Sequence, residues 1–345
     1  MRKYFYLTLM FLSIQNYLGC LPYLYHVSKG QLEIISNRES IDFLIQSQKY
    51  PNWTEKFKLV KHARNFAIQT LGLNPKGGYI YFTKLNRNEV GWHVTACEEL
   101  SFNSYTWWFP IVGSVPYKGF FDLEMAKQEE EKLIKQGYDT RLRITAGYST
   151  LGWFSDPLFS TQLRLRNDEL VALVIHEMAH ATIYFKGDSV FNESYATFLE
   201  DIGTELFYQT GLYSEEKKNL EIRSQAKKEN EFIYQEIKKT ADELKNLYES
   251  NLSRDLKLTK KQEIIEAYRQ RILNSKEKLK FLNVEKFAKA KLNNENFNGV
   301  LRYNSGKKFF QKILEESNYN FINFHTKLKE FSNLTSEKRS KLLED

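Results

Sequence analysis

Cysteine is almost absent from this chain, with only Cys20 and Cys97 among 345 residues. Two cysteines argue against a disulfide framework and do not by themselves indicate a compartment. The chain also has no arginine-rich stripe and no nucleic-acid motif. We therefore interpret its net charge of +7 as a solvated basic surface and expect no nucleic-acid partner. With 42% hydrophobic and 15% aromatic residues it can bury a large core, which predicts a globular protein.

The N-terminus lacks an apolar run long enough to span a bilayer comfortably. It begins with the basic pair Arg2-Lys3, continues with the mostly apolar residues 4–14, and reaches Gly19-Cys20 without an acidic residue. This order is typical of a bacterial secretion signal that ends at a lipoprotein cleavage site, although the two residues before Gly19 depart from the usual pattern. We therefore expect residues 1–19 to be a signal peptide. Cys20 would then carry a lipid that anchors the mature protein in the cell envelope, on a membrane face outside the cytoplasm. The competing interpretation is a buried N-terminal helix.

Residues 20–210 predict a catalytic region of mixed helices and strands. Residues 21–48 and 53–71 have apolar positions at helical spacing. Three aromatic and β-branched segments follow, at 79–82, 90–97 and 102–112. They predict one small sheet of mostly antiparallel strands. We expect Cys97 to be a core residue of this sheet and His93 to be a half-exposed strand residue.

Residues 211–285 predict a long helical hairpin, because 214–250 and 259–282 are amphipathic and rich in Lys and Glu. The second helix is expected to begin at a Thr-Lys-Lys-Gln capping box. Residues 286–331 regain large apolar side chains, so we expect helices that pack on the catalytic region. The last stretch, 332–345, resembles a polar tail that frays.

Residues 170–185 predict a helix that is apolar on nearly every side and must therefore be buried. Its pattern is broken mainly by His176, Glu177 and His180, which form a His-Glu-x-x-His sequence. Burying these groups without partners would cost several kcal/mol. Metal ligation compensates the two imidazoles directly, because residues four apart project from one helix face. The competing interpretation is a structural helix without a metal.

A catalytic zinc needs a third protein ligand, and Asp188 and Glu193 are the candidates. A third His of the metzincin kind is excluded because Ile183 and Lys186 stand where its Gly and His would be. Asp188 lies in a turn, whereas Glu193 begins the amphipathic helix predicted over 192–207. We prefer Glu193, because that helix can hold its carboxylate rigidly against the first helix.

Glu177 lies about 100° around the helix from His176. This offset keeps its carboxylate off the metal and near the attacking water, where a general base is needed. Thr197 and Glu200 lie on the same helix face as Glu193, and either could hydrogen-bond a ligating His. A purely solubilising role for both fits the pattern equally well.

Three stretches resemble one bacterial family, the predicted zinc aminopeptidases. They are VGSVPYKGFFD at 112–122, GYSTLGWFSDPLFSTQL at 147–163 and HEMAHATIYFKGDSVFNESYATFLEDIG at 176–203. The resemblance implies a zincin-like, gluzincin-type core in an α+β fold that is mainly helical. It also implies that zinc is bound by His176, His180 and Glu193, and that Glu177 activates water. Many family members begin as lipoproteins, as Gly19-Cys20 would here.

The function we expect is zinc-dependent peptide hydrolysis. Zinc would polarise the scissile carbonyl, and Glu177 would take a proton from water and pass it to the leaving amine. An edge of the sheet predicted over 79–112 could bind the peptide backbone, and Tyr148 and Tyr303 are candidate oxyanion donors. The aminopeptidase activity comes from the resemblance alone, so endopeptidase or other amide hydrolysis stays open. The alternative function is a non-catalytic envelope protein that uses its hairpin as an interaction arm.

Overall fold

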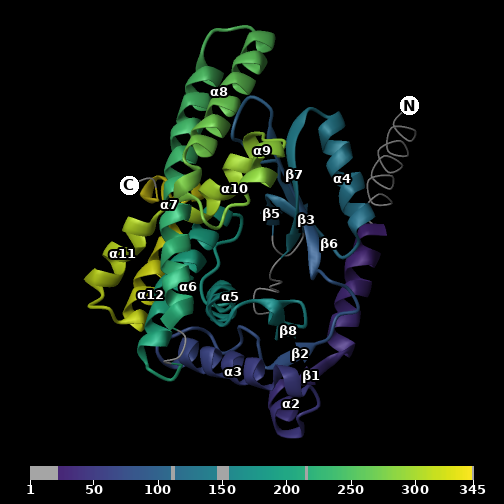
Figure 1. The fold of residues 1–345 in the computed structure, drawn as a ribbon, viewed down its shortest axis with the longest axis vertical. Coiled ribbons are helices and arrows are strands. Elements are labelled where there is room, and N and C mark those ends of the chain that lie inside the picture. The colour runs from purple at the N-terminus through teal and green to yellow at the C-terminus, as the bar shows by residue number, and fades with distance from the viewer. Residues whose placement is uncertain (1–21, 110–112, 146–154, 214–216, 344–345) are drawn as a thin grey trace, which may run out of the picture.

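The computed structural model describes residues 22–109, 113–145, 155–213 and 217–343. The predicted signal peptide and Cys20 lie outside these ranges. None of the helices described within them is long and apolar enough to cross a membrane. The described chain is mainly helical with small, mostly antiparallel sheets (Figure 1), which confirms the α+β prediction at that level.

The N-terminal part combines a small sheet with two helices. Its elements are β1 (Arg38–Ser40), α2 (Ile41–Ser47), α3 (Thr54–Gln69), β2 (Tyr81–Thr83) and β8 (Leu158–Phe159). β2 pairs with β1 in antiparallel and with β8 in parallel orientation. Phe57 of α3 and Phe82 of β2 are fully buried, with ring centroids 5.0 Å apart. This unit therefore forms one side of the main hydrophobic core.

The second sheet has one face on a helix and the other toward the interior of the molecule. Its strands are β3 (Gly91–Glu98), β6 (Tyr117–Phe120) and β7 (Tyr138–Thr145), and the helix is α4 (Leu123–Lys135). β3 is the central strand and is antiparallel to both neighbours. Val94 and Phe120 pack in one cluster with Leu133 of α4. The alternating residues, such as His93 and Tyr117, line a cavity on the opposite face.

The structure corrects the prediction of a single sheet over 79–112. β2 and β3 belong to different sheets, and each already has a partner strand on both edges. β4 (Trp107–Phe109) pairs with β5 (Gly113–Val115) in a separate ribbon. Neither β2 nor β3 thus offers the free edge that was expected to bind a peptide backbone. Cys97 is buried in β3 as a free thiol, as predicted.

Two long helices form the centre of the molecule, α5 (Asn167–His180) and α6 (Ser189–Gln209). They pack closely because Gly203 of α6 has no side chain. A Cβ at this position would lie 2.6 Å from Leu71 Cδ1 and 3.1 Å from Ile175 Cδ1. Most of α5 is buried, including Val171, Val174 and Met178, as its apolar sequence predicts.

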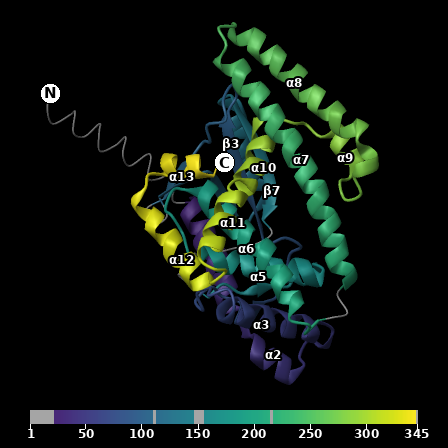
Figure 2. The same ribbon diagram turned by 90° about the vertical axis from the view of Figure 1, so that its left-hand side faces the viewer.

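The helices α7 (Lys217–Glu249) and α8 (Arg254–Asn274) lie side by side and extend beyond the rest of the fold (Figures 1 and 2). α8 begins earlier than predicted. Its N-cap is Ser253, which accepts a hydrogen bond from Leu256 N, so Thr259 lies inside the helix and the predicted capping box is wrong. Lys261 attaches α8 to the second sheet, because its Nζ lies 2.6 Å from Asp139 Oδ2.

Five short helices follow α8 and return to the body of the molecule. They are α9 (Val284–Lys289), α10 (Asn294–Asn304), α11 (Lys307–Glu316), α12 (Phe321–Glu330) and α13 (Ser336–Leu342). Short 3-10 helices occur at Pro51–Trp53, Gln162–Arg164, Lys276–Lys278 and Phe331–Asn333. Phe310 of α11 and Phe324 of α12 are fully buried against Phe198 of α6. α13 lies within the stretch predicted as a polar tail, so that expectation is wrong for residues 336–342.

Candidate metal centre

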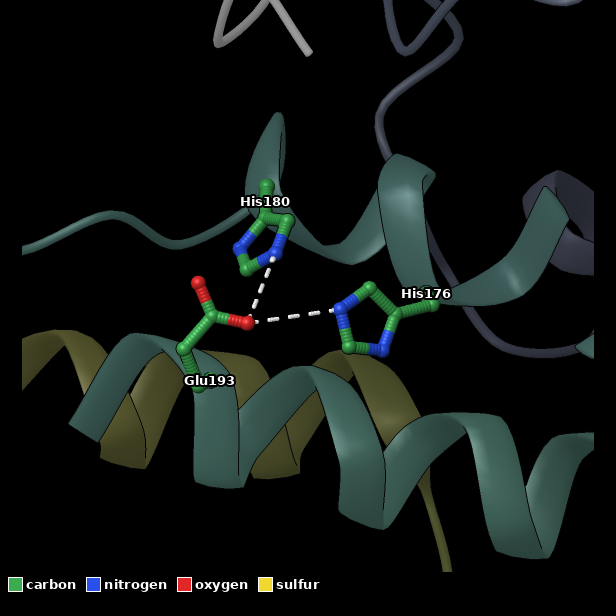
Figure 3. A group of neighbouring side chains, drawn as sticks. All are labelled: His176, His180 and Glu193. Atoms are coloured by element: carbon green, nitrogen blue, oxygen red, sulfur yellow. Dashed lines mark ion pairs between the residues drawn. The ribbon is translucent and has the colours of Figure 1, made fainter. Parts of the chain in front are cut away.

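Two helices bring three candidate ligands to one point (Figure 3). His176 and His180 project from the last turns of α5, and Glu193 projects from the start of α6. One ligand atom from each lies within 4.8 Å of the other two. Glu193 Oε2 is 3.5 Å from His176 Nε2 and 3.6 Å from His180 Nε2. Among the described residues this is the group of His, Cys, Asp and Glu side chains that could hold a metal ion.

The spacing of these atoms fits a small tetrahedral cation. Ligand atoms at about 2.1 Å from a tetrahedral ion lie about 3.4 Å from one another. The two nitrogen–oxygen separations of 3.5 and 3.6 Å are close to that value and long for hydrogen bonds. Two imidazole nitrogens and one carboxylate oxygen are also the donors found in catalytic zinc sites, with one position open. The three residues therefore fit zinc.

Electrostatic interactions within the site keep the carboxylate of Glu193 charged. Burial opposes ionisation of Glu193, but the neighbouring His180 and His176 outweigh it and lower the pKa of the carboxyl. Burial also opposes protonation of His176, but Glu193 and Glu200 raise its pKa. Glu193 and His176 thus stabilise each other's charged form, and a bound cation would stabilise the Glu193 carboxylate without a shared proton.

Glu177 lies beside the ligand group and lines the same cavity. Burial raises the pKa of Glu177, while His176 and His180 act in the opposite direction. A carboxylate whose pKa is raised toward neutrality is a better proton acceptor and donor at physiological pH. The geometry therefore suits the general-base role predicted for Glu177.

A further carboxylate orients His176. Glu200 Oε2 lies 3.1 Å from His176 Nδ1, and Glu200 Oε1 lies 3.3 Å from Nη2 of Arg223 on α7. An Nδ1–H that donates to Glu200 leaves Nε2 free as a ligand. Of the two side chains that the sequence suggested for this role, Glu200 makes the contact, while Thr197 lines the cavity.

Asp188, the rejected third ligand, has a different position. Its Oδ1 accepts a hydrogen bond from Phe191 N and so caps α6. Its Oδ2 lies 2.6 Å from Nε of the buried Arg339 on α13. Both carboxylate oxygens of Asp188 are therefore used by the fold.

The ligand group opens into a cavity of about 710 Å³ between α5, α6 and the inner face of the second sheet. Tyr117 and Tyr303 line this cavity, and the Tyr303 ring lies 6.5 Å from the His176 ring with an interplanar angle of 23°. Burial and nearby Glu193 raise the pKa of Tyr303, so its hydroxyl stays protonated and can donate. Tyr148, the other predicted oxyanion donor, lies outside the described residues.

His93 is more than the half-exposed strand residue that the sequence suggested. It lines the cavity wall opposite the metal ligands, where its Nε2 accepts a hydrogen bond from Arg143 Nε at 3.2 Å. Burial, Arg143 and Arg141 lower the pKa of His93 to about 4, so the ring is neutral. The alternation of His93 with Thr95, and of Arg141 with Arg143, indicates in the sequence that each pair shares one face of its strand. It does not indicate that this face lines a cavity, because that depends on which face of the sheet α4 covers.

Comparison with known proteins identifies the family of this chain. A family model described as "putative aminopeptidase" matches residues 22–343. A search of curated proteins and a search of solved structures each found no match. The family match covers nearly the whole chain, including the helices that carry His176, His180 and Glu193. The chain therefore belongs to the putative aminopeptidase family.

Proposed function

We propose that this protein is a zinc-dependent peptide hydrolase with a zincin-like core formed by α5 and α6. The observation that carries the proposal is the convergence of His176, His180 and Glu193 beside Glu177 in one cavity. The family match adds peptide hydrolysis as the expected chemistry. Removal of amino-terminal residues is the mode that the family description suggests.

The residues of the site have complementary roles in this proposal. His176, His180 and Glu193 would hold zinc, which supplies Lewis acidity that polarises the scissile carbonyl and acidifies water. Glu177 accepts the proton of the attacking water and delivers it to the leaving amine. Glu200 holds His176 in the orientation that presents Nε2. Tyr303 is the candidate donor for the developing oxyanion, because its hydroxyl stays protonated in the cavity wall.

The location of the protein is a separate proposal. The basic start, the apolar run and Gly19-Cys20 support secretion and lipid attachment at Cys20, which would anchor the enzyme in the cell envelope. Mass spectrometry of the mature N-terminus tests this. A chain that starts at a lipid-modified Cys20 is expected, and an uncleaved chain that starts at Met1 would contradict it.

The variant Glu177→Gln tests the catalytic proposal against the alternative of a non-catalytic binding protein. We expect the purified full chain to bind one zinc per molecule and to cleave peptide reporters. Because general acid–base catalysis contributes about 10²- to 10⁴-fold, Glu177→Gln should lose activity by about that factor and keep its zinc. Zinc-loaded protein without turnover would favour the binding protein, and full activity in Glu177→Gln would refute the mechanism.

A further inference from the structure

Two arginines on the sheet side of the cavity have no role in the proposed chemistry. Arg141 and Arg143 are two residues apart on β7, so their side chains share one face of the sheet. Their register partners on β3 are Thr95 and His93, which both line the cavity together with Arg143. Arg143 therefore lies in the wall that faces the metal ligands, and Arg141 lies next to it on the same face of β7.

The two guanidinium groups lie close together beside α10. A Cβ built at Gly299 of α10 would lie 3.1 Å from Arg141 Nη1 and 3.8 Å from Arg143 Nη1. The absence of a side chain at Gly299 thus leaves room for both groups. Two like charges this close repel each other, and repulsion is strongest where the surroundings are partly buried.

Neither arginine has a carboxylate partner. No Asp or Glu oxygen of the described residues lies within 4.0 Å of Arg141 or Arg143, whereas Arg302 lies 3.6 Å from Glu295 Oε1 and Arg223 lies 3.3 Å from Glu200 Oε1. Arg143 Nε donates to the neutral ring of His93. Burial, followed by the charge of Arg143, lowers the pKa of Arg141 to about 10. Glu295 acts on Arg141 in the opposite direction but is paired with Arg302, so neither Arg141 nor Arg143 has an ion-pair partner among the described residues.

The carboxylates of the cavity, by contrast, are already used. Glu169 lies 2.7 Å from Arg166 Nη1, Asp188 pairs with Arg339, and Glu200 contacts His176. Glu193 is a ligand candidate, and Glu177 is needed for proton transfer. Among the described cavity residues, the charge left over for recognising a substrate is therefore positive.

We propose that Arg141 and Arg143 form a binding site for a carboxylate group of the peptide substrate. The planar guanidinium fork matches a carboxylate in bidentate geometry, and two adjacent forks can share one carboxylate. This inference rests on the proposed function, because peptide hydrolysis is the reason to expect a peptide ligand. The carboxylate has two possible sources, the free C-terminus of a short peptide and the side chain of Asp or Glu.

Binding to the zinc-loaded full chain that carries Glu177→Gln tests this without turnover. The probes are tetra-alanine with a free C-terminus, tetra-alanine amide, and two amidated tetrapeptides that contain either Asp or Asn at the third position. A carboxylate with a charge-assisted partner should bind about 10- to 100-fold more tightly than its neutral counterpart. Preference for the free acid identifies the C-terminus as the source, and preference for Asp over Asn identifies the side chain.

Arginine variants assign the preference to the proposed site. The double variant Arg141→Gln/Arg143→Gln should bind acid and neutral probes equally. Arg143→Lys should keep part of the preference, because it retains charge but not the fork. Arg254→Gln is the matched control, because this exposed arginine lies on α8 and pairs with Glu99. It should keep the full preference.

The outcomes separate this inference from the proposed function. Equal binding of acid and neutral probes by protein with intact arginines overturns the carboxylate site, even if the enzyme hydrolyses peptides. A preference that persists in the double variant also overturns the assignment. If the double variant fails to fold, the comparison of acid and neutral probes on protein with intact arginines still tests whether a carboxylate site exists. A clear preference in a protein that never cleaves a peptide supports the site and counts against the hydrolase.

Discussion

Glu200 is predicted to control metal affinity through His176, and Glu200→Gln is the sharpest test of that link. Gln keeps the size of the side chain but removes the charge that faces His176 Nδ1 at 3.1 Å. The imidazole then loses a charge-assisted hydrogen bond, and Arg223 loses one of its two carboxylate partners, the other being Asp201. The three zinc ligands themselves stay unchanged.

The size of the effect follows from the contact. A hydrogen bond to a charged group contributes about 1.5–3 kcal/mol, and the side chain of Glu200 is 28% exposed, which places this one near the lower end. About 1.4 kcal/mol corresponds to tenfold in a binding constant, and partners of metal-bound histidines typically change affinity about 10- to 100-fold. We therefore expect Glu200→Gln to weaken zinc binding about tenfold, measured by competition with a chelator of known affinity.

Glu205→Gln is the control for this prediction. Glu205 lies on the same helix, is 55% exposed, and pairs with Lys227 rather than with a ligand. Its substitution should leave the zinc affinity unchanged. If Glu200→Gln binds zinc within twofold of the unaltered protein, then Glu200 does not position His176 and the reasoning fails.

The remaining predictions concern the third ligand and the stability of the fold. Glu193→Ala should lose zinc and stay folded. Asp188→Ala should keep zinc but lower the free energy of unfolding by about 3–5 kcal/mol, because it leaves Arg339 as an unpaired buried charge. Zinc titration and thermal unfolding check both, and the opposite ranking would overturn the ligand assignment. His325 has a pKa lowered to about 4 by burial and then by Lys329, against 6.5 when unfolded. The unfolded chain therefore binds a proton first, and stability should fall by up to about 3 kcal/mol as pH decreases from 6.5 to 4. His325→Leu should lack this component in urea unfolding at several pH values, and an identical pH profile would refute it. Lys261→Met leaves Asp139 without its ion-pair partner, so amide hydrogen exchange in α8 should accelerate. Unchanged exchange would show that this ion pair does not hold α8 against the second sheet.

Residues His176, Glu177 and His180 could be found from the sequence because they interrupt an otherwise apolar helix. That pattern is local, and helix geometry alone places His176 and His180 on one face. Glu193 needed only one more step, since a helix that follows a short turn must pack on its neighbour. The sequence therefore predicts those site residues that lie on one helix or on two helices that follow each other in the chain.

The opposite wall of the cavity could not be predicted in the same way. Whether Arg141 and Arg143 face the interior depends on which side of β7 is covered by α4, and their closeness depends on Gly299 in α10. The contacts of Gly299 join residues more than 150 positions apart. The pairing of Asp188 with Arg339 is of the same kind, which is why 336–342 resembled a polar tail. Long-range packing leaves no periodic signal in the sequence.

A digest of a mixed peptide library by the zinc-loaded full chain, read at residue resolution by mass spectrometry, shows whether this protein is a peptide hydrolase that depends on Glu177. Glu177→Gln with equal zinc content is the parallel sample. We expect the unaltered enzyme to shorten peptides from their amino termini and Glu177→Gln to leave them intact. A library that stays uncut by zinc-loaded enzyme, or that is cut equally by Glu177→Gln, would contradict this expectation.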